Sequence, residues 1–233
     1  MPSDFVDYIP LATTLVAAAF ALSLFRRFRA KGGLHLLWWG IGAVTYASGT
    51  VTESLTTLLG WHEPVFRLWY ITGALLGGAP LAQGSVYLHL RAPVAHRLTA
   101  ALIATVAVAA TCVWLSPINY ALVEPHHLTG RVLAWQWVRA FSPFINTYAF
   151  IFLAGTAAWS AWRYRTKQET RGRFIGNALI AAGAVLPGIG GSFTRFGHTE
   201  VLYVTEFIGI VLLFLGYRFA TRPALSIPAR DPS

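Results

Sequence analysis

The chain contains little charge. Only 12% of its 233 residues are Asp, Glu, Lys or Arg, whereas 55% are hydrophobic and 14% aromatic. A soluble domain has about 25% charged residues, so this chain has roughly half the charge needed to cover a globular surface. The composition therefore argues against a soluble fold. It predicts an all-α integral membrane protein, because a helix satisfies its own backbone hydrogen bonds in lipid.

Cysteine and lysine are also scarce. The one cysteine, Cys112, excludes an internal disulfide and a cysteine-rich metal site. Both lysines, Lys31 and Lys167, follow apolar runs and are expected in loops. Covalently bound retinal requires a lysine amine within the membrane, so a retinal photoreceptor is excluded. The motifs Gly-x-Ser-x-Gly and His-Glu-x-x-His are absent as well, which leaves no hydrolase or zinc-protease signature.

Seven stretches are long and apolar enough to span a bilayer, which takes about 20 residues. The predicted spans are 8–25, 34–59, 65–90, 98–116, 132–162, 174–193 and 201–219. We expect the run 187–191 (Pro-Gly-Ile-Gly-Gly) to interrupt the sixth span, and Pro80 and Pro143 to kink the third and fifth. The chain 1–233 is thus predicted to be one seven-helix transmembrane domain that ends in a short cytoplasmic tail, 220–233.

The basic residues predict the orientation. Most of the 18 follow spans one, three, five and seven, and so fall on one side of the membrane: Arg26, Arg27, Arg29, Lys31, Arg91, Arg97, Arg163, Arg165, Lys167, Arg171, Arg173, Arg218, Arg222 and Arg230. Cytoplasmic loops are rich in Lys and Arg, which puts the N-terminus outside and the C-terminus inside. The net charge of +9 is then a topology signal, and nucleic acid is not expected as a partner. Much Ala, Gly and Arg with little Lys suggests a bacterial inner membrane.

Residues 1–90 and 132–219 have features in common, as expected of two parallel halves joined by a linker helix at 98–116. Tyr-Ile-Pro at 8–10 matches Phe-Ser-Pro at 141–143, and Arg-Phe-Arg-Ala-Lys at 27–31 matches Arg-Tyr-Arg-Thr-Lys at 163–167. Chance is the alternative, since aromatic and basic residues recur wherever helices meet the cytoplasm. In length, orientation and three-plus-one-plus-three layout, the chain resembles the SWEET sugar transporters. It contains no Pro-Gln dipeptide and no matched asparagines in spans three and seven, so the resemblance is one of layout only.

Three charged residues lie inside predicted spans, where charge is costly and marks either a buried pair or a functional site. They are Glu53, Arg139 and Glu206. Their similar depth in the outer third of the membrane predicts a cluster in which Arg139 pairs with one or both carboxylates. One interpretation is an ion pair that locks three helices, a second is a site for a ligand, ion or proton, and a third is snorkelling of the charged groups to the lipid interface. The predicted ligand-binding residues are these three with Gln83, Tyr46 and Asn146.

Histidine suggests a second, metal-binding constellation. His62, His126, His127 and His198 each lie near a Glu in a predicted outer loop, and imidazole with carboxylate suits Zn, Cu or Fe. None of these loops has the His-x-x-x-His spacing of a helical metal site, so solvated side chains are the alternative. A haem would need two imidazoles on facing helices, and His35 and His89 lie near the cytoplasmic ends of spans two and three. His35 is close to the basic loop, so an interfacial role is the alternative.

Three function classes remain open, besides a structural subunit of a larger membrane complex. The first is a small transporter or ligand-binding membrane protein that holds a small, weakly polar or amphiphilic molecule near Glu53, Arg139 and Glu206. The second is a receptor-like sensory module whose basic loop 163–173 contacts a separate cytoplasmic partner. The third is a metal-dependent membrane enzyme that uses the outer histidines. The bilayer is the one partner that the composition requires, and assembly into a homo-oligomer is left open.

Overall fold

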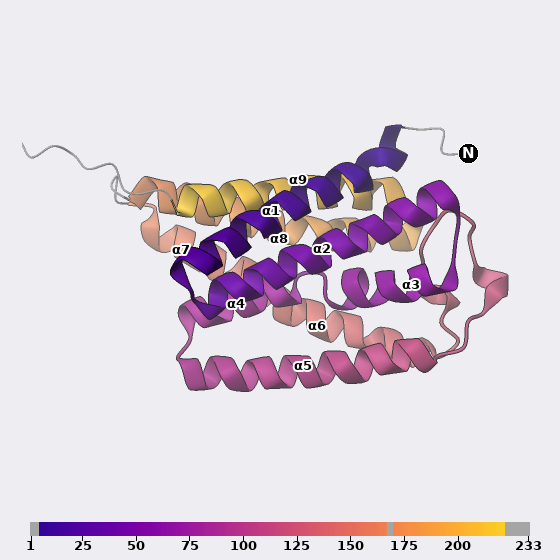
Figure 1. Ribbon diagram of the computed structural model, residues 1–233. Helices are drawn as coiled ribbons and strands as arrows, with labels where there is room; N and C mark the ends of the chain where they lie inside the picture. The colour runs from indigo at the N-terminus through magenta and orange to yellow at the C-terminus, as the bar shows by residue number, and fades with distance from the viewer. Residues whose placement is uncertain (1–4, 167–169, 222–233) are drawn as a thin grey trace, which may run out of the picture.

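Figure 1 shows the computed structural model of the protein, which describes residues 5–166 and 170–221, apart from the side chain of Arg195. This part of the chain is all-helical and contains no strand. Two isolated β-bridges, Ile118–Leu133 and Glu124–His127, lie in the long loop 116–135. The predicted tail from residue 222 onward and Lys167 lie outside the described residues.

The first two long helices form an antiparallel hairpin. α1 (Ile9–Lys31) has a proline in its first turn, where the ring favours the helix and no hydrogen bond is lost. Gly32 and Gly33 then have φ values of +68° and +101°, a region that residues with a Cβ rarely adopt. This turn leads into α2 (Leu34–Leu59), whose bounds agree with the predicted second span.

Six helices in the described residues are long and apolar enough to cross a membrane. The protein is therefore a multi-pass helical membrane protein, and a lipid bilayer is its environment. α2 is not among the six, although its 26 residues would span about 39 Å at 1.5 Å per residue. Its Glu53 and its many Thr, Ser and Gly residues make it less apolar. The six are Phe5–Lys31, Glu63–His89, Ala92–Leu115, Gln136–Tyr164, Arg171–Phe193 and Thr199–Ala220.

The span Glu63–His89 is broken in its middle. α3 (Glu63–Trp69) continues into a π-helical segment, Tyr70–Leu75, and α4 (Ala79–His89) begins only after a turn. Pro80 therefore lies in the first turn of a new helix. Such a break leaves backbone carbonyls without partners, and the Asn146 side chain donates to one of them, the Ala74 carbonyl, at 3.2 Å.

The span Gln136–Tyr164 is irregular in the same way. It begins as a 3₁₀ turn, Gln136–Ala140, and continues through α6 (Phe141–Ala149), a second π-helical segment, Phe150–Gly155, and α7 (Thr156–Tyr164). Pro143 lies in the first turn of α6, where it interrupts no preceding α-helical hydrogen bond. π-helical segments are rare and often occur at functional sites.

The predicted interruption of the sixth span was wrong, because α8 (Arg171–Phe193) runs through Pro187 as one helix. A proline removes the hydrogen bond to the carbonyl four residues earlier, which belongs to Gly183. α9 (Thr199–Ala220) approaches closely there: a Cβ on Gly209 would lie 2.9 Å from the Gly183 oxygen. The close glycine contact accommodates the freed carbonyl between the two helices.

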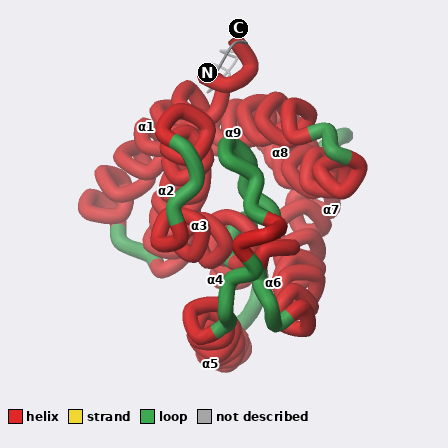
Figure 2. Tube along the Cα trace, turned by 90° about the vertical axis from the view of Figure 1, so that its right-hand side faces the viewer, coloured by secondary structure: helices red, strands yellow, loops and turns green. Residues whose placement is uncertain are grey.

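The helices pack in a ring whose order follows the chain. α1 packs on α2, α2 on α3 and α4, α4 on α6, α7 on α8, α8 on α9, and α9 returns to α1. α5 (Ala92–Leu115) lies outside this ring, beside α4, as the end-on view in Figure 2 shows. The third and fifth spans, which are the two irregular ones, are neighbours in the ring.

Candidate functional site

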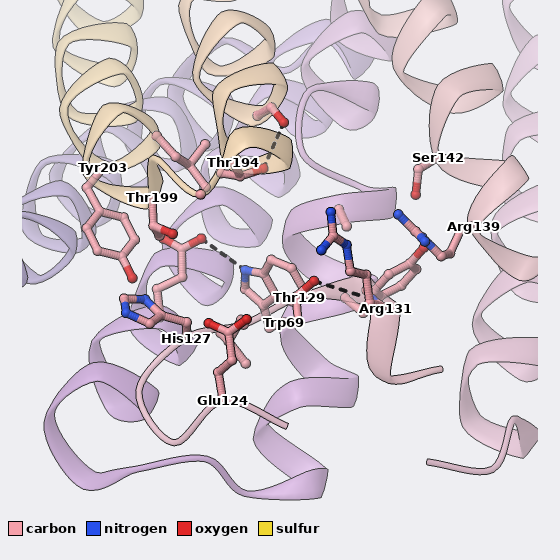
Figure 3. Close-up of a pocket in the computed structure, with 18 of the residues that line it drawn as sticks. Trp69, Glu124, His127, Thr129, Arg131, Arg139, Ser142, Thr194, Thr199 and Tyr203 are labelled. Carbon is pink, nitrogen blue, oxygen red and sulfur yellow. Dashed lines mark hydrogen bonds between the residues drawn. The ribbon is translucent and has the colours of Figure 1, made fainter. Parts of the chain in front are cut away.

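A cavity of about 740 Å³ opens at the end of the ring where α2 meets α3 and α8 meets α9. We call it the Glu53 cavity. Its walls come from α2, α3 with the following π-helical segment, the loop 116–135, the start of α6 and the α8–α9 connection. The two irregular spans therefore contribute much of its surface, and Figure 3 shows the side chains that project into it.

One end of the cavity is acidic and aromatic. Glu53, on α2, is only 4% exposed, and its Oε1 accepts a hydrogen bond of 2.9 Å from the Trp69 indole (Figure 3). The Tyr203 hydroxyl from α9 lies near by and is 3.2 Å from the Thr57 hydroxyl. Glu124 lies at the same end, on the loop (Figure 3).

Glu206 on α9 is the direct neighbour of Glu53. The Oε2 atoms of both carboxyl groups are buried, and neither has a hydrogen-bond partner in the described part of the chain. Two carboxylates only accept hydrogen bonds and cannot bond to each other. A proton on one of the two groups would supply a donor, because a protonated carboxyl group donates one hydrogen bond.

The other end of the cavity is basic. Arg131 and Arg139 lie together beside Ser142, away from Tyr203 and Glu124 (Figure 3). Arg139 donates to the Gln136 side chain at 2.8 Å. The predicted pairing of Arg139 with Glu53 or Glu206 was therefore wrong. Arg139 belongs to a 3₁₀ turn at the cavity mouth, and the ion pairs among the described residues are Arg67–Glu63 and His198–Glu200.

Arg67 forms a buried network behind the cavity wall that the sequence interpretation missed. Its guanidinium donates to Glu63 Oε1 at 2.7 Å and to the backbone carbonyls of Val113 and Ser116 at the end of α5. Tyr120 donates to the other Glu63 oxygen, and this bond raises the pKa of Tyr120. The i,i+4 spacing of Glu63 and Arg67 was the available signal. The network fixes α3 and the loop 116–135 to α5.

Gln83, Tyr46 and Asn146 do not line this cavity. The Gln83 amide is fully buried and bonds to the Ala95 carbonyl, the Thr99 hydroxyl and the Tyr148 hydroxyl. Tyr46 donates to the Glu206 backbone carbonyl at 2.9 Å, and Asn146 bonds across the break in the third span. All three side chains thus hold helices together away from the cavity, whereas Glu53 and Arg139 line it.

The four predicted metal-ligating histidines are exposed and lie in three separate loops, with His126 and His127 adjacent in one of them. His126 bonds to the Thr57 carbonyl at 3.1 Å, His198 pairs with Glu200 at 3.0 Å, and His127 lines the cavity (Figure 3), whereas His62 precedes α3. No group of three His, Cys, Asp or Glu side chains in the described residues has the arrangement to hold a metal ion.

The hydrogen bonds of His89 do not favour the haem hypothesis. Both ring nitrogens of His89 are hydrogen bonded, Nδ1 to the Ser85 carbonyl at 2.9 Å and Nε2 to the Ser160 hydroxyl at 3.2 Å. An imidazole that ligates iron needs one of its nitrogens free for the metal. His35 and His89 line a second cavity at the opposite end of the ring.

The fold and the site define a multi-pass helical membrane protein with a charged cavity at one end. No model of a known protein family matches the chain, and no curated protein matches it either. Its function must therefore be argued from the chemistry of the cavity itself.

Proposed function

We propose that the protein is a seven-helix membrane protein that binds a small zwitterionic molecule in the Glu53 cavity. One observation carries the proposal: a buried carboxyl group beside two aromatic rings faces two guanidinium groups across the same cavity. A ligand ammonium would lie against Glu53, Trp69 and Tyr203, where carboxylate and aromatic faces both attract it. A ligand carboxylate or phosphate would lie against Arg131 and Arg139, since guanidinium binds such groups through paired hydrogen bonds.

The size and the charges favour a zwitterion over the other small ligands. A volume of about 740 Å³ falls within the range of ordinary ligand sites. A neutral sugar or an apolar molecule would cover Glu53 without supplying a cation, and a buried charge without a partner is costly. A simple anion would interact with the arginine end alone. A molecule with both charges satisfies both ends of the cavity at once.

The topology belongs to the same proposal. We take α2 as a seventh span, and we place the Glu53 cavity outside and the opposite, arginine-rich end in the cytoplasm. The parallel halves 1–90 and 132–219, with α5 as linker, are consistent with the packing order: the ring passes from the first half into the second and back, while α5 lies beside it. Cysteine labelling of single-cysteine variants at residues 62 and 97, from opposite sides of sealed vesicles, tests the orientation.

The binding test uses the purified full chain in a neutral detergent. The probes are a series of ω-amino acids from glycine to 6-aminohexanoate, which increases the charge separation one methylene at a time, together with phosphoethanolamine. Each is compared with the alkylamine and the carboxylate of equal length. We expect one zwitterion to raise the thermal unfolding midpoint, and neither single-charge counterpart to do so. The ligand effect should disappear in Glu53→Gln, which keeps the size and the Trp69 hydrogen bond.

A matched control separates loss of charge from loss of fold. Glu200→Gln removes a neighbouring carboxylate that is exposed and does not line the cavity, and it should bind like the unmodified chain. Equal binding of the amine or the carboxylate alone would contradict the zwitterion. Unchanged binding in Glu53→Gln would show that the ligand does not bind in the Glu53 cavity.

Transport is a second candidate, and the broken spans favour it. The third span lines the Glu53 cavity through α3 and the opposite cavity through α4, and the fifth does so through α6 and α7. A π-helical segment separates the two parts in each span. Both spans thus have a place to bend between two cavities that open at opposite ends.

Flux through proteoliposomes tests this second candidate. The zwitterion identified by binding should exchange across the membrane in a counterflow assay, and Glu53→Gln should abolish exchange without loss of folding. Binding without any counterflow would leave a ligand-binding receptor, in which the bound molecule acts from outside.

A further inference from the structure

A second cavity, which we call the Trp39 cavity, opens at the opposite end of the ring. Its volume is about 430 Å³. Arg27, Arg163 and Arg173 line it from α1, α7 and α8. No acidic side chain of the described residues lines it. The cavity is therefore positively charged.

Aromatic rings position two of these arginines. The Arg27 guanidinium lies 5.7 Å from the centre of the Tyr217 ring, and that of Arg173 lies 5.8 Å from the Tyr164 ring. Neither arginine belongs to an ion pair within the described residues. A cation–π contact orients the guanidinium but leaves its positive charge in place, so the cavity keeps its attraction for an anion.

Two buried donors in the wall have no acceptor. The Trp39 indole nitrogen and the Tyr217 hydroxyl both line the cavity, in residues that are 8% and 5% exposed, and neither has a hydrogen-bond partner in the described part of the chain. An indole N–H can only donate, and a buried donor left without a partner is unfavourable. An anionic oxygen in the cavity would satisfy it.

The Trp39 side chain is held firmly in this position. Its ring packs on Gly84 of α4 so closely that a Cβ on that glycine would lie 1.7 Å from Trp39 Cδ1. The contact with the Tyr217 ring, at 5.8 Å between centres, holds its other side. The unpartnered donor is therefore part of a preformed wall.

Part of the wall is apolar. Leu36, Leu88, Trp159 and Ile180 line it together with the arginines. A hydrated inorganic ion would leave these side chains without a partner, whereas a molecule with both an acidic group and a hydrocarbon part would cover them. Basic pockets between transmembrane helices bind anionic lipid headgroups by the same combination.

We propose that the Trp39 cavity binds an amphiphilic anion, with its phosphate or carboxylate group against Arg27, Arg163 and Arg173 and its apolar part against Leu36 and Ile180. Such an anion can come from the membrane, as an anionic phospholipid, or from solution, as a soluble amphiphile. The site is separate from the Glu53 cavity, and the proposal does not depend on what that cavity binds.

The test measures binding to the full chain in a neutral detergent by titration calorimetry. The probes are dihexanoyl phosphatidylglycerol and dihexanoyl phosphatidylcholine, which have the same chains but different net charge. We expect the anionic lipid to bind at least tenfold more tightly. Arg163→Gln and Arg173→Gln should each weaken its binding about tenfold, and Trp39→Phe several-fold, because the phenyl ring lacks the N–H. Arg97→Gln, an exposed arginine outside both cavities, should have no effect.

Two further probes identify the source of the anion. Hexyl phosphate that binds as tightly as the phosphatidylglycerol indicates a soluble amphiphile, and clearly weaker binding indicates a lipid; both results support the site. Inorganic phosphate that binds as tightly as hexyl phosphate or phosphatidylglycerol would contradict the proposal that the anion is amphiphilic. Equal affinity for the two lipids, or affinity unchanged in all three lining variants, would overturn the proposal. Arg163 is exposed, so its replacement leaves the fold intact and the result interpretable.

Discussion

The two cavities lie in one ring but differ in their charges. The Glu53 cavity has a buried carboxyl group at one end and two arginines at the other. The Trp39 cavity has three arginines, unpartnered donors and a partly apolar wall, with no acid among the described lining residues. These charges are the basis for proposing a zwitterion in the first cavity and an amphiphilic anion in the second.

The difference in chemistry is accompanied by a difference in architecture. Loop 116–135 forms a wall of the Glu53 cavity and is fixed to α3 and α5 by the Arg67 network. Most of the residues that line the Trp39 cavity lie in helices. Substitutions can therefore affect one cavity and leave the other unchanged.

Arg67→Met should have the largest effect. The substitution removes the donors for the Val113 and Ser116 carbonyls and leaves Glu63 without its cation. Leaving buried carbonyls without their donor costs about 1–3 kcal/mol. We expect a lower midpoint in thermal unfolding, and loss of zwitterion binding while phosphatidylglycerol still binds.

Arg97→Met is the control for this substitution, because Arg97 is an exposed arginine outside both cavities. It should leave both the unfolding midpoint and the two binding affinities unchanged. Equal loss of both ligands in Arg67→Met would show that the network supports the whole ring and not one cavity.

Glu53→Gln should come next. Removing the charge that faces a ligand ammonium in a buried site costs about 2–5 kcal/mol, so we expect zwitterion affinity to fall about a hundredfold. Binding of phosphatidylglycerol should stay the same, because Glu53 does not line the Trp39 cavity. Arg173→Gln should show the reverse pattern in the same two titrations. Loss of both ligands in either variant would mean that the cavities are coupled.

The sequence predicted the helices better than the site. Gly33 and Gly60 mark both ends of α2, and so its bounds could be predicted from residue type alone. The depth of Glu53 and Arg139 in the membrane could be estimated from their positions in the predicted spans. The direction in which each side chain points could not be estimated. Arg139 lies in a 3₁₀ turn that residue counting had treated as α-helix. Arg131 and Glu124 reach the cavity only through the fold of a loop without periodicity.

The helix break was predicted in the sixth span but occurs in the third, for a related reason. Pro187 and its neighbouring glycines form a helix-breaking pattern when read alone. In the structure, the close approach of α9 at Gly209 accommodates the freed carbonyl, and α8 continues. The break at 76–78 instead depends on Asn146, a residue from another span that satisfies the Ala74 carbonyl. In both spans, contacts with a distant part of the chain determine whether the helix continues or breaks.

Gly84→Ala should affect the Trp39 cavity alone. A Cβ there would clash with the Trp39 ring and with the His35 carbonyl, at 1.7 and 2.8 Å. Overpacking of this kind costs about 2 kcal/mol. Displacement of the indole should weaken phosphatidylglycerol binding several-fold and leave zwitterion binding unchanged. Gly188→Ala is the matched control, because a Cβ at Gly188 meets nothing within 4 Å. A displaced Trp39 with undiminished lipid binding would show that its N–H is not part of the site.

Substitutions of Arg139 should have the smallest effect on zwitterion binding. They distinguish the contribution of charge from that of hydrogen-bond geometry within one cavity. Arg139 is exposed and already bonded to Gln136, so its charge is partly screened by water, unlike that of Glu53. We expect Arg139→Gln to weaken zwitterion binding about tenfold, which corresponds to about 1.4 kcal/mol. Arg139→Lys should weaken it only two- to threefold, because lysine keeps the charge but loses the paired hydrogen bonds. Equal losses in the two variants would mean that geometry outweighs charge at this end, and no loss in either would leave the ligand's acidic group to Arg131.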